Sequence, residues 1–413
     1  MGALITSIGV IFLAVLLLQI PAIQERWGWR VDFGLAYVRG VIDPVEPLPT
    51  AQATPSTIDT PFLHPTATPT QSPTESSRPT ATVLPTVAPT FTPTAIPGQI
   101  LLPAPKWEKQ DVNNCGPATL AMNLRFYGWK GDQTNIASVV KPKKDDRNVN
   151  VEELVAYVNT QVPGLEIQYR VGGDVTTLKR LLAAGFPVMV EETLMGETSS
   201  WPNDDRWAAH YLLITGYDDA NQTFTTQDSY ISPNLVVPYL TLYQNWQSFN
   251  RVYILVYPPE SRPAIQSILG DQWDAEVNRR HAMEVAQKET ELNSKDAFAW
   301  FNLGTNLVYL DKYSQAATAY DKAREIGLPQ RMLRFQFGPF FAYFYVNRLD
   351  DLLELADYAL KISPTSEEAM LWRGWAMYRK GNKEEAIKLF KKGLEQHPGY
   401  TDAEYALKFV GEN

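Results

Sequence analysis

The sequence of 413 residues contains one cysteine, Cys115, in the segment QDVNNCGPATLAM. The residues that follow, ATLAMNLRFYG, carry apolar side chains at helical spacing and stop at Gly128, and Pro117 suits a first helical turn. We therefore expect the thiol at the N-terminus of a helix, where the helix dipole and free N–H groups favour the thiolate. A thiolate is a nucleophile, so the segment predicts a candidate for covalent catalysis.

A thiolate nucleophile also needs a base that takes its proton and returns it to the leaving group. His210 is the one histidine in the same predicted domain, and it begins the predicted strand HYLLITGYDD. The imidazole must be held in one tautomer by an acceptor, and Asp228 ends the strand TFTTQD, after the hairpin signal GYDDANQ that brings it beside His210. Gln110 lies five residues before Cys115 and can donate its amide to an oxyanion, together with the Cys115 N–H.

Other kinds of chemistry are disfavoured by composition and spacing. A single cysteine excludes an intrachain disulfide and a multi-cysteine zinc site, and no HExxH pair occurs, so we expect no metal and no cofactor. Glu191 and Glu192 are adjacent in a predicted strand and point to opposite faces, which disfavours a glycosidase carboxylate pair. The formal charge of -9 argues against nucleic acid as a partner.

The elements around these residues predict an α+β domain over residues 106–258. Three short helices are expected besides the one after Cys115, in the segments DQTNIASVV, VEELVAYVNT and DVTTLKRLLAAG. Short β-branched and aromatic runs bounded by turn residues predict strands in FPVMVEE, HYLLITGY, QTFTTQD and RVYILVY. The order, helices first and strands later, predicts a helical lobe against an antiparallel sheet.

Residues 271–413 are predicted to be all-helical, with a repeat of about 35 residues. Small and aromatic residues recur at one offset of 70 positions: Gly304, Ala316, Tyr320 and Ala323 reappear as Gly374, Ala386, Phe390 and Gly393. The segment AWFNLGTNLVYLDKYSQAATAYDKAREIGLP resembles the tetratricopeptide repeat, which implies a solenoid that binds a protein partner. The middle copy has Pro339 and Phe340 where Leu-Gly is expected, so its first helix should start late or kink.

The N-terminal part has a different composition. Residues 1–24 carry no charge, and the apolar run is long enough to cross a bilayer, so we expect a transmembrane anchor followed by a juxtamembrane segment, 25–43. Residues 44–105 contain 15 of the 30 prolines, with much threonine, which predicts a disordered, extended linker. Three arginines after the span favour a cytoplasmic body, but the Pro/Thr-rich stalk favours the outside. We expect a single-pass membrane protein whose folded domains are extracellular.

The segments QDVNNCGPATLAMNLRFYG and HYLLITGYDD, followed by QD, resemble the papain-like cysteine peptidases of the bacteriocin-processing, double-glycine-leader type. The resemblance covers about 150 residues. It implies that Cys115 is the nucleophile, His210 the general base and Asp228 the residue that orients the histidine, and that Gln110 lines the oxyanion hole. Ser229 follows Asp228, where the family often has proline.

Three functions follow from these observations. The first is a membrane-anchored cysteine peptidase or amidase whose repeats bind a partner or substrate protein; transpeptidation and deamidation use the same acyl-enzyme step and remain open. The second is a catalytically silent papain-like module that binds peptide. The third is a scaffold that recruits partners through both folded domains.

Overall fold

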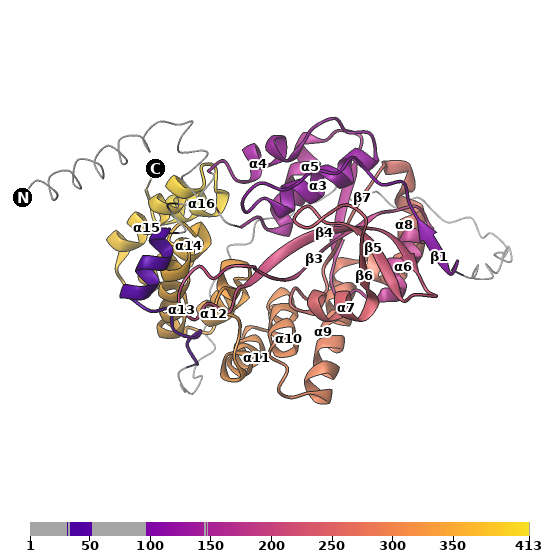
Figure 1. Ribbon diagram of the computed structural model, residues 1–413. Coiled ribbons are helices and arrows are strands. Elements are labelled where there is room, and N and C mark those ends of the chain that lie inside the picture. The colour runs from indigo at the N-terminus through magenta and orange to yellow at the C-terminus, as the bar shows by residue number, and fades with distance from the viewer. Residues whose placement is uncertain (1–30, 32–33, 52–95, 144–145, 147, 413) are drawn as a thin grey trace, which may run out of the picture.

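The computed structural model describes residues 31, 34–51, 96–143, 146 and 148–412. These residues form a mixed α+β domain followed by an array of helices (Figure 1). Among them, no helix combines the length and the apolar character that a bilayer crossing requires. The predicted anchor, residues 1–24, lies outside the described residues, and so does most of the predicted linker.

A seven-stranded antiparallel sheet forms the centre of the α+β domain. Its main path runs β2-β7-β3-β4-β5-β6, and β1 pairs with β4 off this path. The strands are β1 (Gln99–Leu101), β2 (Glu166–Arg170), β3 (Val188–Met195), β4 (Trp207–Asp218), β5 (Thr223–Gln227), β6 (Leu235–Pro238) and β7 (Tyr253–Tyr257). The four predicted strands are β3, β4, β5 and β7. The prediction missed β1, β2 and β6, which have three to five residues each and so give little periodic signal.

Helices cover both faces of this sheet (Figure 1). On one face lie α3 (Cys115–Phe126), α4 (Gln133–Val140) and α5 (Val151–Gln161); on the other lie α6 (Val175–Ala183), α7 (Tyr239–Gln247) and α8 (Arg262–Leu269). Alternate residues of β4 serve the two cores: Tyr211 and Leu213 pack with α3 and α5, while Leu212 and Ile214 pack with α6, α7 and α8. The predicted single helical lobe is thus one of two helical layers, because β3, β4 and β7 are apolar on both sides.

Strand β1 lies within the region predicted as linker and shortens that linker at its C-terminal end. Ile100 of β1 is in register with Tyr217 of β4, and their neighbours pair in the same ladder. This close approach requires glycine at position 216, since a Cβ there would come within 2.6 Å of the Ile100 carbonyl oxygen. The proline-rich composition of this region gave no indication that residues 99–101 pair with β4.

The C-terminal part is a stack of helix pairs. Its helices are α9 (Ala275–Leu292), α10 (Ala297–Tyr309), α11 (Tyr313–Ile326), α12 (Gly338–Tyr345), α13 (Leu349–Ile362), α14 (Glu367–Arg379), α15 (Lys383–Gln396) and α16 (Thr401–Phe409). The recurring glycines lie where paired helices touch: a Cβ on Gly304 would lie 2.8 Å from the Tyr320 ring, and one on Gly374 2.4 Å from the Phe390 ring. The predicted repeat spacing therefore reflects helix-to-helix contact.

The middle repeat has a shortened first helix, as predicted. Helix α12 has 8 residues, whereas α10 and α14 have 13 each. Pro339 lies in the first turn of α12, where its missing N–H leaves no helical hydrogen bond unmade. The residues before it form a turn and a short 3₁₀ helix, Met332–Arg334, that contacts the α+β domain.

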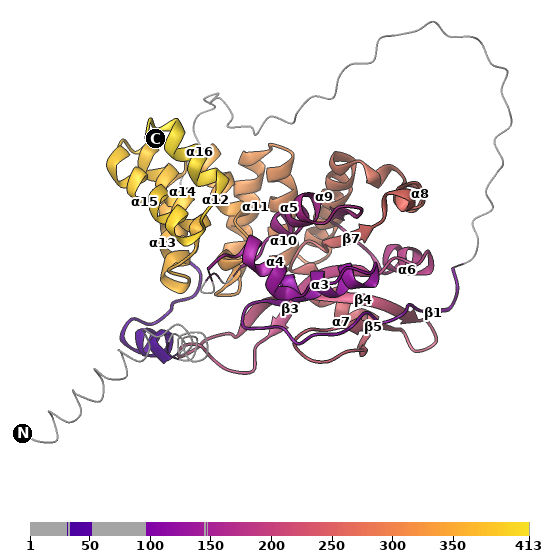
Figure 2. The ribbon, with the colours of Figure 1, turned by 90° about the horizontal axis from the view of Figure 1, so that it is seen from above.

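The helical array packs along the α+β domain, and α5 faces the repeat helices α12 and α14 (Figure 2). A cavity of about 650 Å³ lies between them, and its lining includes Glu153, Phe341 and Trp372. Polar contacts cross this interface, among them Asn250 with Asn306. The face of α12 and α14 that lines the cavity is therefore directed at the α+β domain.

Candidate active site

Cys115 is the first residue of α3, as expected from the sequence. The turn that precedes it places Asn113 in the left-handed region, with φ of 56°, and makes Asn114 the N-cap. The side chain of Asn114 is directed away from the helix and donates to Gln133 Oε1. Both asparagines therefore shape the turn and leave the N-terminal N–H groups of the helix beside the sulfur.

His210 lies in β4, opposite Glu192 of β3. Its Nε2 atom is 2.9 Å from Oδ1 of Asp228, the residue after β5. His210 and Asp228 are buried, with 1% and 2% of their side chains exposed. The β4–β5 hairpin thus brings the two side chains together as the turn signal indicated.

The thiol of Cys115 also lies within hydrogen-bonding reach of the same imidazole. Because Nε2 faces Asp228, Nδ1 is the ring nitrogen left for the sulfur. Burial by itself would raise the pKa of Cys115, but the hydrogen bond and charge of His210, with the N–H groups of Tyr211 and Gly116, lower it below its ordinary value. Burial would lower the pKa of His210, and its bonds to Asp228 and Cys115 raise it to about 10 instead. The pair is therefore electrostatically suited to exist as thiolate and imidazolium.

Asp228 is fixed by bonds to both its backbone and its carboxylate. Trp107 Nε1 donates to its carbonyl oxygen at 2.9 Å, and the N–H groups of Tyr230 and Ile231 donate to Oδ1 at 2.7 and 3.0 Å. Burial opposes ionisation, yet the bond and charge of His210 and these two N–H donors lower the pKa of Asp228. The carboxylate is thus held charged and oriented toward the imidazole.

Gln110 lies on the segment that runs beside Ser229, the residue found in place of the proline common in the family. The Gln110 N–H donates to the Ser229 carbonyl, and the Ser229 hydroxyl donates to Gln110 Oε1, both at 2.9 Å. Because Oε1 is occupied as an acceptor, the Nε2 end of the amide is the end left to donate elsewhere. Ser229 was not predicted as a site residue: it directly follows Asp228, but nothing in the sequence indicated that its hydroxyl would meet Gln110, 119 residues away.

Glu192 is a second buried carboxyl group beside the candidate site that the prediction did not include. Burial raises the pKa of Glu192 to about 7, with the charge of His210 lowering it and that of Asp228 raising it. Its Oε2 atom is buried without a hydrogen-bond partner among the described residues. Glu191, the adjacent residue, faces Tyr211, and burial followed by the charge of Cys115 raises its pKa. The two carboxyl groups thus lie on opposite faces, as expected.

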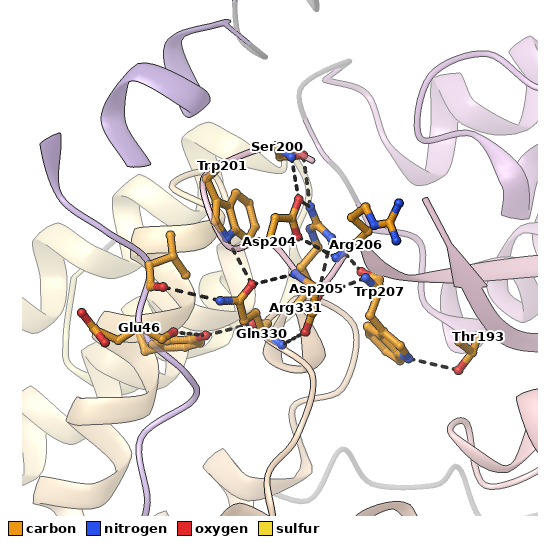
Figure 3. Close-up of polar contacts among 12 residues, drawn as sticks. Glu46, Thr193, Ser200, Trp201, Asp204, Asp205, Arg206, Trp207, Gln330 and Arg331 are labelled. Carbon is orange, nitrogen blue, oxygen red and sulfur yellow. Dashed lines mark hydrogen bonds and ion pairs between the residues drawn. The ribbon is translucent and has the colours of Figure 1, made fainter. Parts of the chain in front are cut away.

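The strand that carries His210 is anchored at its start by the helical array (Figure 3). Arg331 follows the first repeat and inserts into the β3–β4 hairpin, where it forms an ion pair with Asp204 and donates to the Trp207 carbonyl at 3.0 Å. Its guanidinium lies 4.4 Å from the ring centroid of Trp201. Arg331 and Asp204 are separated by 127 residues, so the sequence gave no indication of their contact.

One group of metal-ligand side chains occurs within the described part of the chain. It consists of Asp146, Glu367 and His397, whose ligand atoms lie within 4.8 Å of one another. His397 Nδ1 is bonded to Glu367 Oε1 at 3.0 Å, and this bond, ahead of the opposing effect of burial, raises the pKa of His397. Glu367 and His397 therefore already have each other as ion-pair partners without a metal ion.

Residues 101–254 match the family model described as Peptidase_C39 like family, and residues 367–400 match that of the tetratricopeptide repeat. The protein thus combines a C39-like α+β domain with a helical tetratricopeptide region, as the sequence resemblance predicted. No curated protein matches the sequence.

Several solved structures are similar to parts of the chain. A putative C39-like peptidase from Bacillus anthracis has 17% identity and a TM-score of 0.31, with 38% of this chain and 97% of that chain covered. The peptidase domain of Streptococcus ComA, described as a bifunctional ABC transporter in quorum sensing, has 19% identity and a TM-score of 0.29, covering 38% and 98%. MamA has 14% identity and a TM-score of 0.30, covering 34% and 82%.

Proposed function

We propose that the protein is a cysteine peptidase that hydrolyses peptide or amide bonds through an acyl-enzyme. One observation carries the proposal: His210 lies 2.9 Å from Asp228 and, on its other side, within hydrogen-bonding reach of the Cys115 thiol at the N-terminus of α3. This is the arrangement that a thiolate nucleophile, its base and an orienting carboxylate require. The C39-like fold and the order of the three residues along the chain support it.

In the first half of the reaction, the Cys115 sulfur attacks the carbonyl carbon and forms a tetrahedral intermediate. The negative charge on oxygen is stabilised by the N–H groups at the start of α3 and by the Gln110 amide, whose oxygen is engaged by Ser229. His210 gives its proton to the leaving amine as the C–N bond breaks, which leaves a thioester on Cys115. Asp228 keeps the ring in the orientation that this transfer needs.

In the second half, water replaces the amine. The imidazole, now neutral, takes a proton from water, and the hydroxide attacks the thioester carbonyl. The C–S bond then breaks and the product acid leaves. The proton taken from water stays on the imidazole, so the site is again a thiolate–imidazolium pair. An amine in place of water would give transpeptidation from the same thioester.

We further propose that the helical region binds a protein or peptide partner and that the chain is membrane-anchored with its folded domains outside the cell. The tetratricopeptide match supports the first part, since such repeats commonly present binding surfaces. The second part rests on the apolar residues 1–24 and the Pro/Thr-rich composition after them. Protease added to intact cells tests it: cleavage between residues 52 and 95 is expected, and protection until lysis would contradict this orientation.

The Cys115→Ser variant tests the peptidase proposal. We expect loss of hydrolysis of a peptide library with little change in thermal unfolding, because the swap is nearly isosteric but the hydroxyl is a much weaker acid than the thiol. Ser229→Ala, which removes a nearby hydroxyl that is not the nucleophile, serves as the folded control with reduced rather than absent activity. Full activity of Cys115→Ser would remove the thiol from the mechanism.

The pH dependence of thiol alkylation separates a catalytic site from a silent peptide-binding module. Cys115 is the only thiol in the chain, so one label reports on one group. We expect the alkylation rate to reach half of its maximum well below the ordinary thiol pKa of about 8.5, because His210 stabilises the thiolate. An ordinary midpoint, together with intact peptide binding, would favour the silent module.

A further inference from the structure

We propose that residues 43–50, here called the strap, are an intramolecular proline-rich ligand of the helical region, so that the Pro/Thr-rich residues 52–95 form a loop closed at both ends. The strap has the sequence DPVEPLPT and no helix or strand. The strap lies along α13 (Figure 2). On the other side of residues 52–95, the chain continues into β1, which is part of the sheet. The observation contradicts the predicted free linker at its N-terminal end.

Four side chains of the helical region donate hydrogen bonds to the strap, and they do so mainly through backbone carbonyls. Lys361 donates to the Pro44 oxygen at 2.9 Å, Gln330 to that of Val45 at 3.4 Å, Tyr358 to that of Glu46 at 3.1 Å and Arg324 to that of Pro49 at 2.7 Å. Lys361 also pairs with the Asp43 carboxylate at 2.7 Å.

The apolar contact of the strap is made by Leu48. Its side chain is 6% exposed and belongs to the core that includes Tyr358 and Leu333. Burying a leucine side chain contributes about as much to docking as several of the carbonyl bonds together. Leu48 therefore anchors the strap, and the four donors fix its path.

This chemistry fits an extended proline-rich segment. Pro44, Pro47 and Pro49 fix three φ angles near −65°, which lowers the entropy lost on docking, and they leave carbonyls without internal partners. Recognition of proline-rich peptides commonly uses side-chain donors to such carbonyls and a pocket for an apolar residue. The surface formed by Arg324, Gln330, Tyr358 and Lys361 supplies both.

The strap also lies at the junction of the two domains. Gln330 donates to Val45, and its Oε1 accepts from Trp201 Nε1 and from the Asp205 N–H, both at 3.2 Å (Figure 3). Gly40, just before the strap, lies so close to Trp201 that a Cβ there would be 2.5 Å from the Trp201 Cβ. A docked strap therefore ties the chain before residue 51 directly to the folded body.

Cutting the loop tests this proposal in the full-length chain. A site-specific protease sequence is inserted between Gln71 and Ser72, the protein is purified in mild detergent and cleaved, and the pieces are separated by size exclusion. We expect the N-terminal piece to remain with the folded body after complete cleavage. Separation of the two pieces would overturn the proposal.

Leu48→Asp and Leu84→Asp form a matched pair for this experiment, since both leucines lie in the same tripeptide, Leu-Pro-Thr. Leu48 is buried against the helical region, so Leu48→Asp is expected to release the N-terminal piece, whereas Leu84→Asp is expected to retain it; Leu48→Asp alters the strap and leaves every helix intact. Equal retention in both variants would overturn the proposal. A dimeric mass of the uncut chain by light scattering would do so as well, because the strap would then be exchanged between copies.

Discussion

Two buried groups of ionisable side chains, one at Cys115 and one between the domains, differ in the balance of acids and bases. At the candidate site, His210 stands between the thiol and Asp228, and each acid has a direct bond to it. The pKa of each acid is lowered despite its burial, and that of the base is raised. The charged forms are therefore favoured here in spite of burial, because the three groups are arranged in a continuous alternation of sign.

Between the domains the acids outnumber the bases. Glu153 of α5 meets Glu367 and Glu368 of α14, with His397 paired to Glu367. Burial and the neighbouring carboxylates raise the pKa of Glu368 to about 8, and burial likewise raises that of Glu153. The bonds from Asn150 to Glu368 and from Ser366 to Glu368 satisfy oxygen atoms but supply no charge.

The contrast shows that burial alone does not decide whether a group is ionised: it opposes charge in both places, and only the partners differ. A buried acid with a basic partner stays charged and can do chemistry near neutral pH, whereas a buried acid among other acids takes up a proton. The two groups should therefore respond to pH in opposite directions, and each can be altered without touching the other.

The largest effect is expected from breaking the balance at the candidate site with Asp228→Asn. The amide can keep the bonds from Tyr230 and Ile231 but loses the charge that holds His210 protonated. We expect kcat/KM for peptide hydrolysis to fall on the order of 10²–10⁴-fold, and the alkaline limb of the pH profile, set by His210 near 10, to move to lower pH. Asp218→Asn, at the end of the same strand β4, is the control; an equal loss in it would contradict the role of Asp228.

A smaller effect, on stability, is expected from Arg331→Met. This change leaves Asp204 buried without its cation, which costs about 3–5 kcal/mol of unfolding free energy. The same substitution at Arg280, whose ion pair with Glu276 is exposed, should cost about 1 kcal/mol or less. Denaturant unfolding of both variants measures the difference, and the double variant Arg331→Met with Asp204→Leu should recover much of the loss. Equal free energies of unfolding for Arg331→Met and Arg280→Met would contradict the burial of the Arg331–Asp204 ion pair.

The smallest effect, and the one that sharpens the contrast, is expected from Glu368→Gln. Because the pKa of Glu368 is raised to about 8, the folded chain keeps a proton that the unfolded chain releases near pH 4.5. The stability that this proton contributes is complete below about pH 4.5 and is lost as pH rises toward 8. The variant should therefore be about 1–3 kcal/mol more stable than the native chain at pH 8 and nearly equal at pH 4.5.

Glu404→Gln, in the exposed first turn of α16, is the control for Glu368→Gln: it keeps Glu368, so its stability should follow that of the native chain at each pH. Thermal unfolding at a series of pH values measures both. If the stability of the native chain relative to Glu368→Gln rises from pH 4.5 to 8, Glu368 is not protonated in the folded chain.

Local patterns were sufficient to predict much of the site. A helix begins at Cys115, a strand carries His210, and a hairpin returns Asp228 to it; each of these follows from residues fewer than about 20 positions apart. The repeat period and the late start of the middle repeat at Pro339 were likewise local signals. The catalytic roles of these residues remain a proposal.

The missed features all join distant segments. Ser229 meets Gln110 across 119 residues, and Arg331 meets Asp204 across 127. The strap meets α11 and α13 about 300 residues later, and its composition by itself predicted a linker. Glu192 looked like an ordinary strand residue until the register of β3 and β4 placed it opposite His210.

The sequence by itself determined four of the seven strands, the helix that begins at Cys115, the three residues Cys115, His210 and Asp228 of the candidate site, and the part of the chain that repeats, because capping, periodicity and turn chemistry act over a few residues. Only the tertiary structure decided the charge state of the buried groups, the faces of the sheet that are covered, and the docking of residues 43–50. Those properties depend on desolvation and on partners brought together by folding, and a carboxyl such as Asp228 or Glu368 has the same covalent structure whichever partner it receives.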